Sequence, residues 1–152
     1  MIVRKATLED FPHYLALARE FHAASPMHNV INLDAVGYEQ FYTKAIHDDN
    51  IGVWIAEVGD DFVGITGALL YPMYFSPSNL VAQELWWWMT PKARGHGVGK
   101  AMFNAITEWA KAKNAKAVLM IALEDENVDK MTNLYAREGF KPMERTYIKE
   151  VA

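Results

Sequence analysis

Six residues, Arg94-Gly95-His96-Gly97-Val98-Gly99, stand between a tryptophan-rich apolar run and an amphipathic helical pattern. Glycine lets backbone N–H groups approach a ligand closely, and the helix that follows adds unpaired N–H donors and the positive end of its dipole. A turn of this kind binds anions. The sequence therefore predicts a ligand that carries phosphates, and the alternative is a glycine-rich start of a helix with no ligand.

Two common phosphate loops do not fit this segment. A dinucleotide-binding fingerprint needs a further glycine three residues after its second glycine, and Lys100 and Met102 stand at the positions that could supply it. A Walker A loop needs glycine where Arg94 stands and Ser or Thr where Ala101 stands. Both classes of nucleotide-binding protein are excluded.

Length and composition are typical of one globular domain spanning 1–152, because the 152 residues are 51% hydrophobic and 22% charged. The sequence has no apolar run near the roughly 20 residues of a membrane span and begins without the apolar core of a signal peptide, so we expect a cytoplasmic protein with no membrane partner. The chain has no cysteine, and its five histidines lack metal-ligand spacing, so we expect no metal. A net charge of −4 makes nucleic acid an unexpected partner.

Hydrophobic periodicity and turn residues predict the order β-α-α-β-β-β-α-β-α-β, a mixed sheet flanked by helices in the α/β (α+β) class. Ser25-Pro26 should end the first helix, and Gly59-Asp60 should turn a hairpin. The expected strands are 1–6, 51–58, 61–70, 81–89, 117–123 and 143–151; the expected helices begin after Thr7 or Asp10, span 34–47 and 98–112, and run from 128 to just before Gly139; and a loop is expected at 71–79.

The segment Arg94-x-x-Gly97-x-Gly99, between a strand and a helix, resembles the pyrophosphate loop of the GNAT superfamily of N-acyltransferases. Downstream, Leu134-Tyr135-x-x-x-Gly139-Phe140 is similar to the second signature of that family, and Met1 to Phe11 looks like its usual opening. The resemblance covers nearly the whole chain. It implies the mixed, splayed GNAT sheet, acetyl-CoA as cosubstrate, and direct transfer of the acetyl group to a primary amine on a small molecule, a protein N-terminus or a lysine.

Two other functions stay open beside amine acetylation. One is a non-catalytic sensor that binds acyl-CoA on the same fold, and the other is a toxin-like enzyme that acetylates aminoacyl-tRNA. The acidic balance counts against the second, because such an acceptor favours a basic surface. A homodimer is a further expectation.

The resemblance also implies which residues bind acetyl-CoA. Main-chain groups near Trp88 and Met89 should pair with the pantetheine arm as an added strand would, and the glycine loop should hold the pyrophosphate. Asn127 resembles a family asparagine near the pantetheine, although it stands one residue further from the tyrosine than is usual. The expected acetyl-CoA-binding residues are Trp88, Met89, Arg94, Gly95, His96, Gly97, Val98, Gly99, Lys100 and Asn127.

Two residues are candidates for catalysis. Tyr135 matches the family tyrosine that faces the sulfur of CoA, and a phenol with a pKa near 10 can protonate a departing thiolate; the alternative is aromatic core packing. Glu84 is the one carboxylate in the apolar strand 82–89, where burial would raise its pKa toward the range of a general base. The alternative is an exposed carboxylate that bonds Gln83 or a loop. Without a bulge, Glu84 and Trp86 share one face of the strand.

The acceptor amine should bind between the first two helices and the aromatic loop. His22 and His28 lie on or just after the first helix, and Tyr71, Tyr74 and Phe75 lie in the segment 71–79. Aromatic rings attract an ammonium group, so these five residues are the expected acceptor site. Surface or packing roles for the histidines, and coverage of the sheet edge by the aromatics, are the alternatives.

Overall fold

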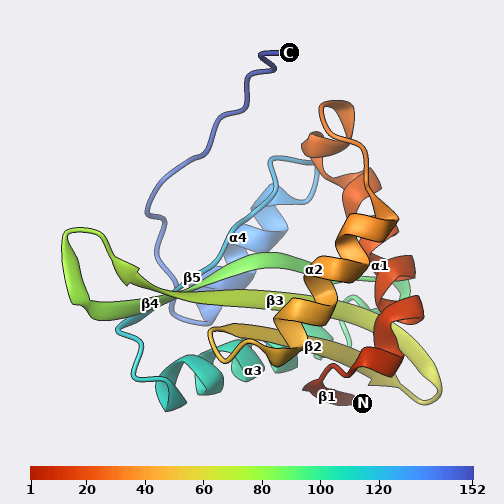
Figure 1. Ribbon diagram of the computed structural model, residues 1–152, viewed down its shortest axis with the longest axis horizontal. Helices are drawn as coiled ribbons and strands as arrows, with labels where there is room; N and C mark the ends of the chain where they lie inside the picture. The colour runs from red at the N-terminus through yellow and green to blue at the C-terminus, as the bar shows by residue number, and fades with distance from the viewer.

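The computed structural model describes residues 1–152 and contains one five-stranded sheet with the order β1-β2-β3-β4-β5 (Figure 1). The pairs β1–β2, β2–β3 and β3–β4 are antiparallel, and the pair β4–β5 is parallel. The strands are β1 (Ile2–Lys5), β2 (Ile51–Val58), β3 (Asp61–Met73), β4 (Ser76–Met89) and β5 (Ala117–Leu119), and the helices are α1 (Phe11–Ala24), α2 (Ala35–His47), α3 (Val98–Ala112) and α4 (Val128–Arg137). None of these helices is long and apolar enough to cross a membrane.

Side chains of the expected kinds define the helix ends. Ser25 ends α1, and Pro26 begins a short 3₁₀ turn, Pro26–Asn29. The Asp34 carboxylate accepts hydrogen bonds from the N–H groups of Val36 and Gly37, both at 3.1 Å, and so caps the start of α2. These boundaries confirm the predicted bounds of both helices.

The core lies on both faces of the sheet. Helices α1 and α2 cover one face, where Tyr14 and Tyr42 pack against Ile55, Ile65 and Trp86. Helix α3 covers the other face with the apolar side chains of Val98, Met102 and Ile106, and α4 packs beside α3 because the Tyr135 ring lies 5.4 Å from that of Phe103. Since both faces of β4 are covered, its nearly continuous apolar sequence has a physical reason.

A bulge at Leu85 interrupts β4. Glu84 pairs with Ala68 of β3 and Trp86 pairs with Gly67, so Leu85 has no partner. The extra residue reverses the side-chain alternation. Ala68 belongs to the core beneath α3, whereas Trp86 belongs to the core beneath α1 and α2. Glu84 and Trp86 therefore lie on opposite faces, and the expectation that they share one face is wrong.

Three segments differ from their predicted structure. Strands β3 and β4 continue through most of the expected loop 71–79, which leaves only Tyr74 and Phe75 at the turn, because β3 and β4 keep pairing as far as Met73 and Ser76. The strand predicted at 117–123 ends at Leu119, where β5 separates from β4. The strand predicted at 143–151 does not form, because this segment runs away from the sheet instead of along the free edge of β5 (Figure 1).

Candidate active site

A cleft of about 450 Å³ opens where β4 and β5 separate. Gln83 and Leu119 form the last pair of the two strands, and the bulge at Leu85 then turns β4 away from the chain that continues β5. The cleft lies between these diverging segments. Its lining consists of Phe21, Ser25 and Met27 from the α1 end, Glu84, Leu85, Trp87, Trp88 and Met89 from β4, Arg94 and Gly95 from the glycine loop, and Ile121, Ala122, Leu123, Asp125, Asn127, Lys130, Met131 and Leu134 from the segment after β5 and from α4.

Glu84 stands at the point where the strands separate, and its side chain is buried with 3% of its surface exposed. Its Oε2 accepts a hydrogen bond of 3.0 Å from the backbone N–H of Ile121. Burial raises the pKa of Glu84 to about 8, and the Ile121 N–H opposes that rise only in part. The alternative of an exposed carboxylate is thus excluded by its burial, and the group exchanges protons near neutral pH.

Tyr135 approaches the same backbone unit from α4. Its hydroxyl donates a hydrogen bond of 2.6 Å to the carbonyl of Ile121. Burial raises the pKa of Tyr135, and the negative charge of Glu84 raises it further, so the phenol keeps its proton. The ring packs against Phe103 and Phe140, and the cleft wall beside it is formed by Leu134 and Ile121.

Ile121 is the functional residue that sequence reasoning missed. Its N–H binds Glu84 and its C=O binds Tyr135, so one peptide segment positions both candidate groups. Any side chain could stand at a position that acts through its backbone, and the sequence therefore carried no signal for it.

The glycine loop has the backbone geometry of an anion site. Gly95 and Gly97 have φ values of 84° and 81°, in the region that favours glycine. The first hydrogen bond into α3 is made by Ala101 N–H to the Gly97 carbonyl at 3.1 Å, so the N–H groups between them precede the helical ladder. A Cβ on Gly99 would lie 3.0 Å from Met89 Cε and from Trp87 Cζ2, so glycine there lets α3 approach β4 closely.

The other predicted acetyl-CoA residues lie at or near the cleft with differing contacts. Trp88, Met89 and Arg94 line it, and the Arg94 guanidinium carbon lies 5.2 Å from the centre of the Trp88 ring. Lys100 pairs with Glu138 at 3.6 Å, with its own side chain largely exposed. Asn127 lines the cleft at the start of α4, and His96 is exposed in the glycine loop.

The five residues predicted for the acceptor do not line the cleft. His22 Nε2 lies 2.7 Å from the Ile31 carbonyl and His28 Nδ1 lies 2.7 Å from the Ser25 carbonyl, so both histidines hold the connection between α1 and α2. Among the aromatics, the Tyr71 hydroxyl donates to Gln83 Oε1 at 2.7 Å.

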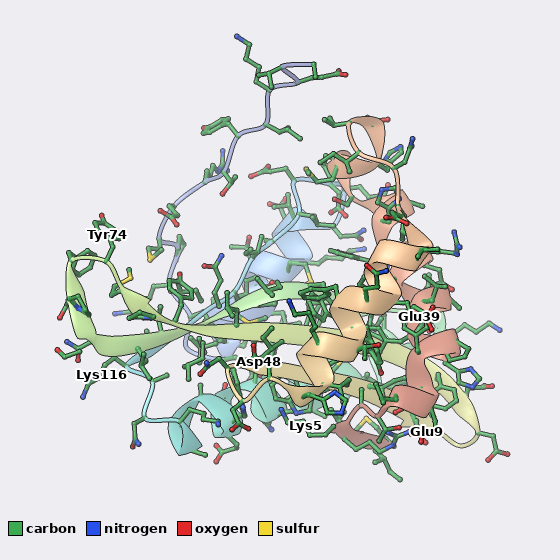
Figure 2. The ribbon with its side chains drawn as sticks, viewed as in Figure 1. Lys5, Glu9, Glu39, Asp48, Tyr74 and Lys116 are labelled. Carbon is green, nitrogen blue, oxygen red and sulfur yellow. The ribbon has the colours of Figure 1, made fainter.

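Tyr74 and Phe75 are carried to the tip of the β3–β4 hairpin, where Tyr74 is 88% exposed (Figure 2). The placement of this aromatic pair at the cleft was wrong because the two strands extend further than their turn-forming residues indicated. The end of the cleft near α1 is lined instead by Phe21, Ser25 and Met27. The sequence signal for them was their position on the same α1 connection as the two histidines.

One cleft thus joins the glycine loop before α3 to an apolar wall and to the buried carboxyl of Glu84, and the Tyr135 hydroxyl is bonded to the lining residue Ile121. It suits an extended ligand with a phosphate group at one end and a reacting group at the other. The side chains form no cluster of three or more His, Cys, Asp or Glu that could hold a metal ion.

Solved structures share this fold over nearly their whole length. A predicted acetyltransferase from Clostridium acetobutylicum with acetyl-CoA is 16% identical, with 98% of this chain and 95% of that chain covered and a TM-score of 0.76. An aminoglycoside acetyltransferase from an uncultured soil metagenomic sample, in complex with sisomicin, is 20% identical, with coverage of 99% and 94% and a TM-score of 0.69. Ribosomal-protein-alanine N-acetyltransferase from Brucella melitensis is 14% identical, with coverage of 99% and 100% and a TM-score of 0.74.

The sequence comparisons agree with the fold. No curated protein matches the chain significantly. Residues 13–140 match the acetyltransferase (GNAT) family, a range that includes the glycine loop, Glu84 and Tyr135. The chain therefore belongs to the GNAT family of acetyltransferases.

Proposed function

We propose that this protein transfers the acetyl group of acetyl-CoA to a primary amine by direct attack, with Glu84 as general base and Tyr135 as general acid. The observation that carries the proposal is the attachment of both groups to Ile121, where Glu84 accepts from the N–H and Tyr135 donates to the C=O. Glu84 lines the cleft that reaches the glycine loop, and Tyr135 is bonded to the lining residue Ile121, which supports the two roles. Direct transfer needs both groups and no covalent intermediate.

The cleft has the parts that acetyl-CoA requires. The positive φ values of Gly95 and Gly97 and the unpaired N–H groups at the start of α3 suit a pyrophosphate, with Arg94 as a nearby cation. Beyond Gln83, the edge of β4 that faced β5 has no strand partner, so backbone groups near Trp88 and Met89 are available to a pantetheine arm. The Clostridium acetobutylicum neighbour, whose structure contains acetyl-CoA, supports this assignment.

The two side chains divide the proton transfers of the reaction. The amine nitrogen forms a bond to the thioester carbonyl carbon, the C–S bond breaks, and the thiolate leaves. Glu84 takes the proton that the amine gives up, directly or through a water, and its pKa of about 8 suits a base that works near neutral pH. Tyr135, which burial keeps protonated, gives its proton to the departing thiolate.

The acceptor is proposed to be an amine on an apolar body, either a small molecule or a protein N-terminus or lysine. Phe21, Met27 and Leu85 form an apolar wall close to Glu84 in the cleft. One structural neighbour is an aminoglycoside acetyltransferase and another acetylates a ribosomal-protein alanine, so amines of both kinds are accepted on this fold. Action in the cytoplasm stays a prediction from the sequence.

A panel of amines and N-terminal peptides tests the proposal. Each is incubated with acetyl-CoA and the protein, release of free CoA is followed, and the product is identified by mass spectrometry as an amide. Glu84→Gln serves as the matched variant, because it keeps the shape of the side chain and removes its basicity. Tight acetyl-CoA binding with no CoA release for any amine would instead favour the sensor function.

A further inference from the structure

Lys5, the last residue of β1, meets two tryptophan rings on the face of the sheet that α3 covers. In the antiparallel pairing of β1 and β2, Lys5 stands directly opposite Trp54, so the two side chains lie on the same face. The Lys5 Nζ lies 4.0 Å from the centre of the Trp54 ring and 5.2 Å from the centre of the Trp109 ring, which belongs to α3. The amine of Lys5 therefore rests against two indoles.

The two rings are held in place by packing. A Cβ on Gly52 would overlap the Trp54 ring, so this ring lies flat along its own strand in space that glycine leaves open. Trp109 meets the Trp54 ring edge-on, with the ring centres 5.5 Å apart and the ring planes at 79°. Trp54 is buried, and both rings belong to the core beneath α3. The walls beside the Lys5 amine are therefore fixed, and neither wall is an oxygen acceptor.

These surroundings favour the neutral amine. An ammonium group has three N–H donors, but Lys5 takes part in no ion pair, because the cations of the ion pairs in this chain are Arg4, Lys100, Lys111 and Arg145. The ring faces attract a cation but do not replace its hydrogen bonds to water. Burial, and then the positive charge of Lys113 at the end of α3, lowers the pKa of Lys5 to about 8. About half of the Lys5 amine is thus neutral at pH 8, against less than about 1% for an ordinary lysine.

Lys5 is an exposed residue despite these contacts, so a reagent in solution can reach its side chain. It also lies apart from the candidate active site. β1 is the first strand in the sheet order, whereas the cleft with Glu84 opens beside β5 at the other edge. Figure 2 shows Lys5 well away from Lys116, which directly precedes β5. A reaction at Lys5 therefore does not need the groups of the cleft.

We propose that the Lys5 amine is acetylated directly by acetyl-CoA, in a reaction that uses none of the groups in the cleft. The neutral nitrogen forms a bond to the thioester carbonyl carbon, and the C–S bond breaks. The proton that the nitrogen gives up neutralises the departing CoA thiolate, so the products are an acetamide on Lys5 and free CoA. An uncharged group then replaces a cation against the two indoles, and the repulsion between Lys5 and Lys113 disappears. This modification is independent of the amine transfer proposed above.

Mass spectrometry of the full chain tests the proposal without an assay of turnover. The protein is incubated with acetyl-CoA at pH 8, and the remaining amines are then blocked with deuterated acetic anhydride, so that every lysine gives a light-to-heavy ratio. Lys111 is the control within the same molecule, because its side chain is largely exposed and pairs with Glu108 at 2.8 Å. We expect Lys5 to be acetylated at least about fivefold faster than Lys111, since its larger neutral fraction outweighs the lower nucleophilicity of a less basic amine.

Three further measurements examine the cause of this preference. S-acetyl-N-acetylcysteamine, a thioester without phosphates, should show the same preference for Lys5, because it lacks the group that the glycine loop would bind. The rate at Lys5 should level off above about pH 9, whereas the rate at an ordinary lysine still rises toward pH 10. Trp109→Leu, which removes one ring and admits water, should bring the Lys5 rate to within about twofold of the Lys111 rate.

Four outcomes would overturn the proposal. They are a Lys5 rate no higher than that of Lys111, a Lys5 rate that still rises between about pH 9 and pH 10, a preference seen with acetyl-CoA but not with the small thioester, and an unchanged preference in Trp109→Leu when circular dichroism shows that variant to be folded. The first three are measured on the natural chain, so they decide the matter even if the variant does not fold.

Discussion

As the pH rises, the wild-type protein should lose stability and gain activity through the titration of Glu84. Replacing Glu84 with glutamine should remove both trends. The carboxyl is 3% exposed, and its pKa is about 8 in the folded protein against an ordinary value of 4.5. The folded state binds this proton more tightly than the unfolded chain does. The contribution of the Glu84 proton to the free energy of unfolding is therefore fully present below pH 4.5 and is lost as the pH rises through 8. Glutamine stays neutral and can still accept from the Ile121 N–H.

The magnitude follows from the two pKa values. Their difference, 8 − 4.5 = 3.5, multiplied by roughly 1.36 kcal/mol for each pKa unit, gives about 5 kcal/mol over the whole range. About 3 kcal/mol of this falls between pH 5 and pH 8. The wild-type protein should therefore lose about 3 kcal/mol of unfolding free energy relative to Glu84→Gln over that interval.

Urea unfolding of both proteins at several pH values measures this difference, and comparison with the variant cancels the titration of all other groups. Glu144→Gln, the same atomic change on an exposed residue, controls for the loss of one formal charge. Activity should show the reverse trend: the wild-type rate should rise with pH through about 8 as the base loses its proton, and Glu84→Gln should lack this limb. A stability difference that is constant from pH 5 to pH 8 would refute the reasoning.

Three further substitutions test the rest of the site. Gly97→Val forces a β-branched residue to a φ of 81° and obstructs the anion site, so calorimetry should show at least a tenfold loss of acetyl-CoA affinity in a folded variant. Tyr135→Phe should lower turnover by about 10²-fold with unchanged acetyl-CoA affinity, and equal turnover would leave Tyr135 a packing residue. Phe21→Ala should raise the KM for the amine severalfold without changing acetyl-CoA affinity, whereas Tyr74→Ala at the hairpin tip should have wild-type kinetics.

Much of the fold was predictable because its signals are local. The cap at Asp34, the stop at Ser25-Pro26 and the glycine loop before α3 each act within a few residues, and the structure confirms the helix boundaries that they predict. The apolar strand around Glu84 made its burial one of two open alternatives, and the structure decides for burial. Each of these features depends on residues that are close in the sequence, so each can be predicted without knowledge of tertiary contacts.

The errors arose where pairing between distant segments decides the structure. The bulge at Leu85 depends on the register between β3 and β4, and no residue type at that position specifies it. The hairpin continued past the prolines and serines that indicated a loop, because pairing between Tyr71 and Val81 outweighed the local turn tendency. The strand predicted at 143–151 does not form because this segment runs away from the free edge of β5 (Figure 1), a path that no local pattern could have revealed.

The bulge connects these errors to the function. By turning β4 away from β5 it opens the cleft, and by reversing the alternation it directs Glu84 toward α4 and Ile121. Ile121 then meets the buried carboxyl with its N–H and the Tyr135 hydroxyl with its C=O, so a displacement of this one residue would move the acid and the base together. The burial of Glu84 and the opening of the cleft therefore both depend on the bulge at Leu85.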